Sequence, residues 1–180
     1  MGIDLGDGYT LRPWDAAWRD GDQERFVTLA NDYDIWVNLR DRFPHPYTRA
    51  DAEEWVALQS GRDPATVFAV CDGEGPIGAV GLETREADYR HSAELGYWLG
   101  KPFWGRGVIT QAAKAMTAYG FETLGLLRID AHVKAGNGAS ARVLEKAGYR
   151  REGLLRKAAL KEGALVDYLL YAILREEWRR

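Results

Sequence analysis

The sequence predicts a mixed α/β fold, in which a mostly antiparallel sheet of about seven strands is flanked by about four helices. Two observations predict this class. Apolar residues follow helical spacing near the start of the chain and strand-like alternation in its middle, so that three consecutive strands follow two helices. The element order also contains a single early crossover rather than repeated β-α-β units. No repeat or linker divides the chain, and we expect one domain over residues 1–180.

The first three predicted elements are a strand and two helices. Residues 9–14 (YTLRPW) predict a short strand. Apolar residues recur at helical spacing over residues 22–41, and the polar step at Asn31 predicts a break within that stretch. Thr48, followed three residues later by an acidic residue, is typical of a helix start, and this helix ends before Gly61.

The middle of the chain predicts three strands in succession. Residues 66–71 are apolar and β-branched, a DGEG turn follows, and residues 77–84 form the hairpin partner. Residues 92–99 (SAELGYWL) alternate in polarity, which places Glu94 on the face opposite to Leu95. These three segments therefore predict an antiparallel meander.

The second half begins with the longest predicted helix, over residues 107–124. Its apolar residues lie near one face, and Gly125 ends it. One short helix and three strands are expected after it, with the helix over 137–147 and the strands over 127–133, 149–155 and 165–174.

The composition excludes several classes of protein. The chain has 180 residues, a net charge of −3 and 46% hydrophobic residues, so no basic face favours nucleic acid. No apolar run approaches the roughly 18 residues of a membrane span, and the first residues lack the regions of a signal peptide. Cys71 is the single cysteine, which excludes multi-cysteine metal sites, and the three histidines are scattered. We expect a cytoplasmic protein without a metal, a membrane or a nucleic-acid partner.

The most informative stretch is GKPFWGRGVITQA, residues 100–112, which joins a predicted strand to the long helix. Gly105 and Gly107 allow backbone N–H groups to turn toward one point, and the helix start adds unpaired amides and a positive dipole end. A phosphate or pyrophosphate suits such a site, and Arg106 can add a charged contact. The same glycines also suit a plain connecting turn, so this motif alone leaves both interpretations open.

Two other phosphate-binding motifs fit poorly. A P-loop requires Gly-Lys-Ser/Thr after its first glycine and spacer, and this sequence lacks it. The dinucleotide fingerprint requires a third small residue where Thr110 stands, although Asp130 lies at about the downstream distance of the ribose-binding acid, roughly 20 residues. That fold also places its glycine turn after the first strand, whereas three antiparallel strands are predicted before this one.

A second informative stretch is NGASARVLEKAGY, which begins at Asn137 after a predicted strand. Asn137 is a good N-cap and Ser140 lies in the first turn of the helix. Capping alone would explain Asn137. The combination of this capped helix with the preceding glycine loop favours a functional role.

This pair of motifs resembles the GNAT superfamily, and more narrowly the branch that contains the ribosomal-protein N-terminal (alanine/serine) acetyltransferases. The resemblance also includes YTLRPW, PHPYTRADAEEW, ELGYWLGKPFWGRG and GALVDYLLYAIL, in the expected order over nearly the whole chain. It implies a GNAT-like fold that agrees with the predicted elements. It also implies acetyl-CoA as cosubstrate.

The resemblance implies a set of residues that contact acetyl-CoA. The loop should hold the pyrophosphate through its backbone amides and Arg106, the strand before it should pair with the pantetheine arm, and Asn137 should contact the pantetheine or thioester. Pro102 stands where the family pattern has Gln or Arg, which removes a side-chain contact. The implied cofactor-binding residues are Leu99, Trp104, Gly105, Arg106, Gly107, Val108 and Asn137.

The resemblance also implies catalytic groups. Many members carry a tyrosine as general acid where Leu144 stands here, and Ser140 matches the serine proposed to replace it in this branch. An amine must lose a proton, to a base or to ordered water, before it attacks. Glu94 is the first candidate base, because its strand faces the thioester in this family. A backbone N–H near Leu99 would meet the oxyanion. The other candidate bases are Glu83, Glu162 and Asp167.

The implied function is acetyl transfer from acetyl-CoA to a primary amine, directly within a ternary complex. A protein or peptide N-terminal α-amine is the first candidate substrate. Two alternatives stay open, namely a small amine (a polyamine, an amino sugar or an amine antimetabolite) and a non-catalytic acyl-CoA-binding sensor. Both a monomer and a homodimer are compatible with the resemblance.

Overall fold

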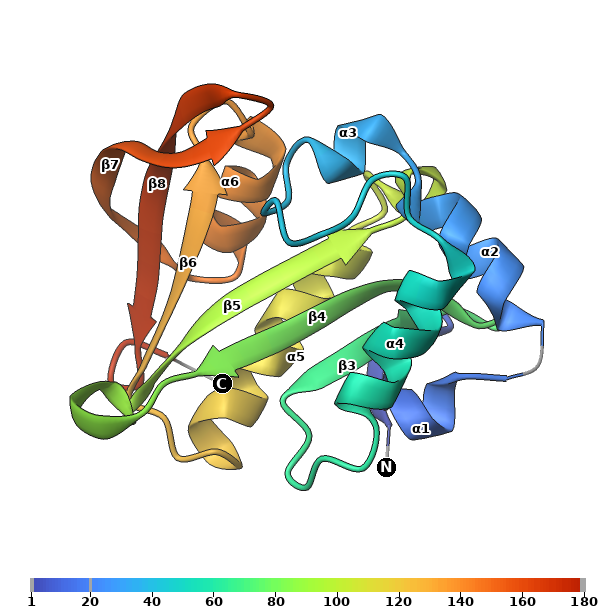
Figure 1. Cartoon of the computed structure of the whole chain (residues 1–180). Helices are drawn as coiled ribbons and strands as arrows, with labels where there is room; N and C mark the ends of the chain where they lie inside the picture. Colours follow the sequence, from blue (N-terminus) through green and yellow to red (C-terminus); the bar gives the residue numbers. More distant parts are fainter. Residues whose placement is uncertain (1, 20, 179–180) are drawn as a thin grey trace. The chain divides into compact units, whose positions relative to one another are not determined.

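The computed structural model describes residues 2–19 and 21–178. Within them, eight strands are hydrogen-bonded in the order β1-β2-β3-β4-β5-β6-β8-β7 (Figure 1). The β5–β6 pair is parallel, whereas β1–β2, β2–β3, β3–β4, β6–β8 and β7–β8 are antiparallel. The structure thus confirms the predicted mixed and mostly antiparallel sheet.

The elements follow the predicted order. The strands are β1 (Ile3–Gly6), β2 (Tyr9–Pro13), β3 (Val67–Cys71), β4 (Pro76–Thr84), β5 (Ser92–Leu99), β6 (Arg128–Lys134), β7 (Arg150–Lys161) and β8 (Ala164–Leu174). The helices are α1 (Trp14–Ala17), α2 (Asp22–Ala30), α3 (Tyr33–Trp36), α4 (Arg49–Gln59), α5 (Val108–Glu122) and α6 (Gly138–Lys146), with short 3₁₀ turns η1 (Ala87–Tyr89) and η2 (Lys101–Phe103).

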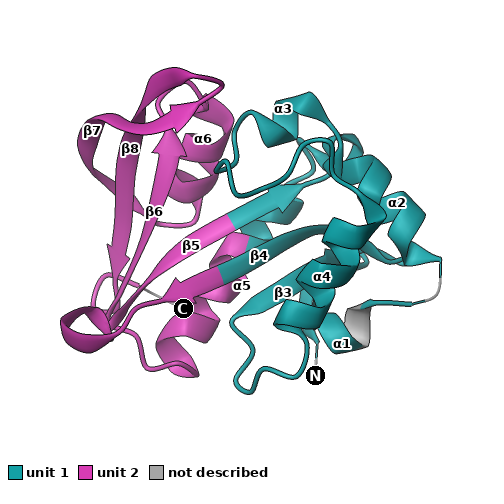
Figure 2. Cartoon of the chain, in the orientation of Figure 1, with its two compact units in different colours: residues 1–81, 97–112 teal, residues 82–96, 113–180 magenta. Residues whose placement is uncertain are grey.

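The chain forms two compact units (Figure 2). Unit 1 comprises residues 1–81 and 97–112, and unit 2 comprises residues 82–96 and 113–180. Strands β4 and β5 and helix α5 each run from one unit into the other. The expectation of a single domain over residues 1–180 stays a prediction.

Unit 1 is built around an aromatic core. Helix α1 contacts β2, β3 and α4, and α2 packs against α4. Trp14 and Phe26 are both buried, and their rings meet edge to face with centroids 5.5 Å apart. The core cluster comprises Trp14, Phe26, Ala30, Tyr47, Ala52, Ala69, Cys71 and Ala79.

Hydrogen bonds of polar side chains set where two helices of unit 1 begin and end. Thr48 and Asp51 form the predicted capping box, in which each side chain bonds the other residue's backbone N–H and so satisfies amides that the helix leaves unpaired. Asn31 explains the predicted break. Its amide group donates to the carbonyl oxygens of Val27 and Tyr47 and accepts from the Tyr47 N–H, which ties the end of α2 to the segment before α4.

Unit 2 contains the β6–β8–β7 sheet and α6. Strands β6 and β8 pair from Arg128 opposite Leu174 to Lys134 opposite Tyr168. Buried hydroxyl groups of Thr117 on α5 and Tyr149 lie 2.8 Å apart, so neither is left without a hydrogen bond in the core.

The structure differs from the prediction at three places. The sheet has eight strands rather than about seven, because β1 was missed. Strand β1 (IDLG) forms a hairpin with β2, and the turn residues Asp7 and Gly8 both have positive φ, as an Asp-Gly turn prefers. The single turn of α1 was also missed, and β7 extends to Lys161, beyond the predicted end at residue 155.

Candidate functional site

The loop between β5 and α5 forms an open backbone turn in unit 1. Gly105 and Gly107 have φ of +76° and +81°, a region that residues with side chains rarely adopt. A Cβ added at either position would meet no atom within 4 Å, so the space in front of the loop is open. The glycines are therefore required by the backbone conformation, and the loop is free to receive a ligand.

The start of α5 gives this loop its electrostatic character. Val108 begins a 15-residue helix, whose first amides have no partner within the helix and whose dipole favours an anion. The exposed Arg106 guanidinium lies over the Phe103 ring, with 5.6 Å between its central carbon and the ring centroid. Backbone amides, dipole and guanidinium together suit a phosphate or pyrophosphate group.

Trp104 ties the loop to the last residue of β5. Its indole Nε1–H donates to the Leu99 carbonyl oxygen over 2.7 Å, while the ring is 45% exposed. The last residue of β5 and the loop are thereby held in a fixed relation. A carbonyl oxygen has two lone pairs, so Leu99 can still accept from a second donor.

Asn137 and Ser140 lie together at the start of α6 in unit 2. The Asn137 side-chain oxygen accepts from the Ser140 N–H over 3.1 Å, as an N-cap does. Both side chains are half-buried. Leu144, where many family members carry tyrosine, is fully buried in the core and offers no hydroxyl.

Glu94 belongs to a cluster of ionisable groups in unit 2. Its carboxylate is 15% exposed, and its Oε1 lies 3.1 Å from Nδ1 of His132 on β6. The register of the parallel β5–β6 pair sets Glu94 opposite Asp130. Arg85 binds both oxygens of Asp130, over 2.6 and 2.8 Å, and lies 3.9 Å from Glu94.

The same cluster contains donor atoms that a cation could use. One ligand atom each from Glu94, Asp130 and His132 lie within 4.8 Å of one another. Both Asp130 oxygens are already bound to Arg85, which would compete with a metal ion. The expectation of no metal stays a prediction.

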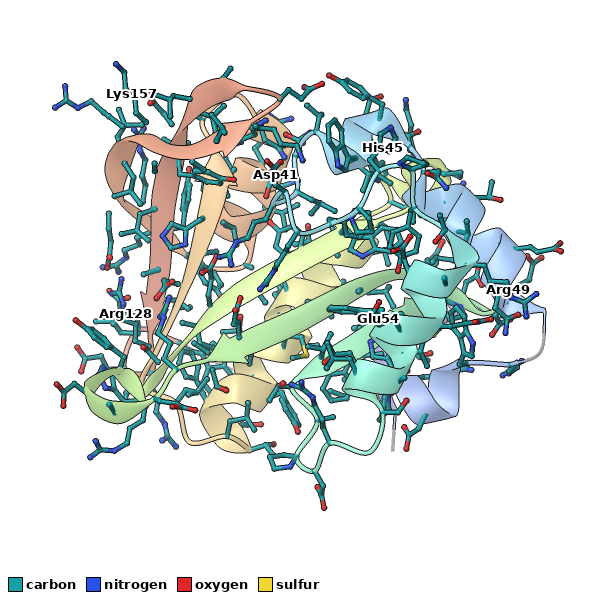
Figure 3. All side chains as sticks on the ribbon, in the orientation of Figure 1. Asp41, His45, Arg49, Glu54, Arg128 and Lys157 are labelled. Carbon is teal, nitrogen blue, oxygen red and sulfur yellow. The ribbon has the colours of Figure 1, made fainter. Side chains whose placement is uncertain are left out.

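The other candidate bases lie in different surroundings. Glu83 on β4 is exposed, and Glu162 occupies the β7–β8 turn with a φ of +51°. The Asp167 Oδ1 accepts from the backbone N–H of Lys157 over 2.7 Å, near the Lys157 label in Figure 3. Among these four carboxylates, Glu94 is the one whose oxygen lies beside an imidazole.

Cys71 is in the wrong state to serve as a nucleophile. It is fully buried in the unit 1 core, and this burial raises the pKa of its thiol to about 11. A thiol with that pKa is almost entirely protonated near neutral pH. Acyl transfer through a cysteine intermediate is therefore disfavoured.

Sequence reasoning missed the partners of Glu94. It treated His132 as one of three scattered histidines and considered Asp130 only as a ribose ligand. Asp130 and His132 are two residues apart on one strand, so alternation places both on one face. That signal was available, but the parallel pairing that brings them to Glu94 was not.

The comparisons with known proteins agree with this picture. A family model described as an acetyltransferase (GNAT) domain matches residues 9–150. The chain belongs to the GNAT acetyltransferase family. This match confirms the family resemblance seen in the sequence.

Several curated relatives are similar to this GNAT chain. The probable N-acetyltransferase YjcK of Bacillus subtilis is 39% identical over 156 residues, which cover 87% of this chain and 82% of the relative. The ribosomal-protein-serine acetyltransferase of Escherichia coli is 30% identical over 125 residues, or 69% of each chain. The putative ribosomal N-acetyltransferase YdaF of B. subtilis is 38% identical over 86 residues, 48% of this chain and 47% of that relative, so the match spans about half its length.

Two solved structures share the fold over nearly the full length. A GNAT-family acetyltransferase from Bacillus anthracis has a TM-score of 0.80 and 27% identity, covering 98% of this chain and 99% of that chain. Spermidine N-acetyltransferase from Vibrio cholerae, in complex with CoA and spermine, has a TM-score of 0.73 and 27% identity, covering 96% and 98%.

The lengths and apolar content of the helices bear on whether the chain could span a membrane. Among residues 2–19 and 21–178, none is both long enough and apolar enough to cross a membrane.

Proposed function

We propose that this chain transfers the acetyl group of acetyl-CoA to the α-amine of a protein or peptide N-terminus in the cytoplasm. The observation that carries the proposal is the arrangement along β5. This strand holds the half-buried Glu94 and ends at Leu99, directly before the open glycine loop. A base on a strand and an anion-binding loop directly after that strand suit direct transfer between two bound substrates.

The loop would bind the coenzyme. Backbone amides from Trp104 to Val108 and the Arg106 guanidinium would hold the pyrophosphate, because Gly105 and Gly107 face open space and the guanidinium adds positive charge. Within this stretch the Trp104 N–H already donates to the Lys101 carbonyl oxygen over 3.1 Å, so the amides after it are the first candidates. The backbone near Leu99 would pair with the pantetheine arm as an added strand does. Asn137 would contact the pantetheine or the thioester from the start of α6.

The chemistry would begin with loss of a proton from the substrate ammonium group to Glu94. The neutral amine nitrogen then attacks the thioester carbonyl carbon, and a backbone N–H near Leu99 stabilises the negative oxygen. When the carbon–sulfur bond breaks, the Ser140 hydroxyl would give a proton to the departing thiolate and regain one from the nitrogen, which loses its second proton as the amide forms. No covalent enzyme intermediate is needed, which agrees with the buried and protonated Cys71.

Names of relatives favour two substrate classes. The E. coli relative acts on a ribosomal-protein serine and the V. cholerae structure holds spermine, so a polyamine is the second candidate. The match to the E. coli enzyme covers 69% of this chain at 30% identity, and the motif order also resembles that branch. We therefore rank the N-terminal α-amine first.

The test is thiol release from acetyl-CoA across short peptides, polyamines and amino sugars. We expect release with peptides that bear a free α-amine and none when that amine is blocked. Release with small amines alone would overturn the peptide assignment but keep the mechanism. Binding of acetyl-CoA without release for any amine would overturn the enzymatic proposal in favour of an acyl-CoA sensor.

A further inference from the structure

The Arg85–Asp130 pair carries an inference beyond the proposed function. Asp130 is 5% exposed, and both its oxygens bind the same guanidinium. The Arg85 Nη1 also donates to Ser92 Oγ over 3.2 Å, and Ser92 in turn donates to the Tyr89 carbonyl oxygen. Arg85 is thereby fixed where the segment after β4 meets the first residues of β5 and β6.

This pair lies beside the proposed base. One carboxylate oxygen each of Glu94 and Asp130 and one ring nitrogen of His132 lie within 4.8 Å of one another. Two carboxylates and an imidazole are therefore close neighbours. The negative charge of Asp130 favours the protonated form of the neighbouring Glu94. Arg85 is 3.9 Å from Glu94 and binds Asp130 directly, so its positive charge opposes that effect.

We propose that Arg85 and Asp130 are positioning residues, whose ion pair sets the charge around Glu94 and His132 so that these two together accept the substrate proton near neutral pH. The proposal rests on the proposed function, since it assigns Glu94 to proton transfer. Arg85 and Asp130 act through Glu94 and need not touch the substrate.

The neighbouring charged groups come from three strands of the sheet, and a fourth strand adds a tyrosine. Glu83 on β4 interacts with Arg85, and Arg128 on β6, labelled in Figure 3, lies 3.9 Å from Asp130. Arg128 binds both oxygens of Glu152 on β7, which lowers the pKa of that carboxyl. Tyr168 on β8 meets the His132 ring edge-on, with centroids 6.3 Å apart.

Removing the Arg85 charge should raise the apparent pKa of the Glu94–His132 pair. In Arg85→Gln the two carboxylates face each other without the guanidinium, so protons bind the Glu94–His132 pair more tightly. The apparent pKa of the pair rises, and we use the pair because strongly interacting groups titrate together. The enzyme requires the deprotonated pair. The acid limb of the pH profile of kcat/KM (called the acid limb below) therefore moves to higher pH, by about one unit or more.

Removing the Asp130 charge should lower the apparent pKa of the Glu94–His132 pair. In Asp130→Asn a negative charge leaves and Arg85 is released toward Glu94, so protons bind the pair less tightly. The acid limb moves to lower pH, and the plateau rate falls because the base is weaker. A double variant should return the limb toward its wild-type position, since both charges are gone.

A purely structural role would not produce opposite signs. Either substitution breaks the same ion pair, and a structural effect would lower stability in both without moving the acid limb. Arg25→Gln is the matched control, because Arg25 binds both oxygens of Asp72 over 3.0 and 2.6 Å in unit 1. We expect it to lower Tm without moving the limb, and Arg85→Lys to keep the limb near the wild-type position.

A second measurement does not depend on turnover. The chain has three histidines, so the His132 imidazole signal can be assigned in a proton NMR titration by its loss in His132→Gln. Without any acetyl-CoA, its apparent pKa should rise in Arg85→Gln and fall in Asp130→Asn. If one variant does not fold, the other still has a predicted sign against wild type.

The outcomes separate the two proposals. Opposite shifts of the acid limb and of the His132 titration would support the positioning role. Shifts in the same direction, or none, would overturn it. If wild type transfers no acetyl group to any amine, the proposed function fails, while the NMR titration still decides whether this ion pair controls the charge of the cluster.

Discussion

Glu94 illustrates how a residue acquires a role from its neighbours. Alternation in the sequence places it on the face opposite to Leu95, and the resemblance makes it the first candidate base. The structure adds what surrounds it, because β6 brings His132 to within 3.1 Å and Asp130 to the paired position. A half-buried carboxylate beside an imidazole is a more credible proton acceptor than an exposed one.

The first prediction concerns that carboxylate. Glu94→Gln keeps the shape of the side chain but cannot accept the proton, so kcat should fall by about 10²- to 10⁴-fold. The Kd for acetyl-CoA should stay at the wild-type value, as measured by calorimetry. Glu83→Gln, at an exposed position on β4, is the control and should keep the wild-type rate. A wild-type rate in Glu94→Gln would assign the base to another group.

Asn137 has two roles that a single substitution can separate. Asp is as good an N-cap as Asn, so Asn137→Asp should preserve Tm, whereas Asn137→Ala should cost about 1 kcal/mol of stability. The carboxylate cannot donate the hydrogen bond that the amide offers to the coenzyme, so acetyl-CoA should bind roughly tenfold more weakly to Asn137→Asp. Unchanged binding by calorimetry would leave Asn137 as a cap alone.

At the scale of elements, the most informative feature is the junction of β5, the glycine loop and α5. The strand supplies a backbone edge, the loop turns amides outward, and the helix adds its dipole. Each contribution can be predicted from a local pattern, because glycine spacing and helix starts are set by neighbouring residues. The Trp104–Leu99 hydrogen bond that fixes the junction has no such pattern.

A prediction at this scale uses two glycines with the same conformation. Gly107→Trp should abolish acetyl-CoA binding, because the indole would fill the open space in front of the loop. Gly163→Trp is the matched control, since Gly163 has a φ of +77°, equally open surroundings and a position in the β7–β8 turn. Both changes carry similar backbone strain, about 1–2 kcal/mol. Tight acetyl-CoA binding by Gly107→Trp in calorimetry would contradict the loop assignment.

At the scale of the whole molecule, the two units share their framework. Strands β4 and β5 and helix α5 are each divided between the two units, so each unit contains only part of these three elements. We therefore expect a single cooperative unfolding transition rather than two. The tryptophans suit this test, because Trp178 is in unit 2 and the other six of the seven are in unit 1.

Gly78→Ala tests this expectation, because it perturbs unit 1 while probes in both units report unfolding. A Cβ on Gly78 would lie 2.4 Å from the Trp98 carbonyl oxygen and 3.0 Å from the Leu99 Cα, so the backbone of β4 or β5 must move. We expect a loss of about 1–3 kcal/mol. The same fall in Tm should appear in tryptophan fluorescence and in the His132 NMR signal of unit 2. Gly96→Ala is the control on β5, where a Cβ meets nothing within 4 Å and Tm should not fall.

The sequence by itself determined the elements, the order in which they occur and the parts of the site that are continuous in the chain. Helix periods, the Thr48 capping box, the Asn137 cap and the glycines at 105 and 107 are local features, so they could be read without the fold. Strand β1 is the exception: it has only four residues, although Ile3 and Leu5 alternate with Asp4 and an Asp-Gly turn follows.

Only the tertiary structure decided what surrounds Glu94. The parallel pairing of β5 with β6 sets Asp130 opposite Glu94, and Arg85, 45 residues from Asp130 and directly after β4, binds Asp130 there. Pairing between distant strands depends on the packing of the whole chain and leaves no mark in either segment alone. The partners that set the charge of Glu94 are therefore a property of the folded sheet, whereas Glu94 itself and the glycine loop belong to the sequence.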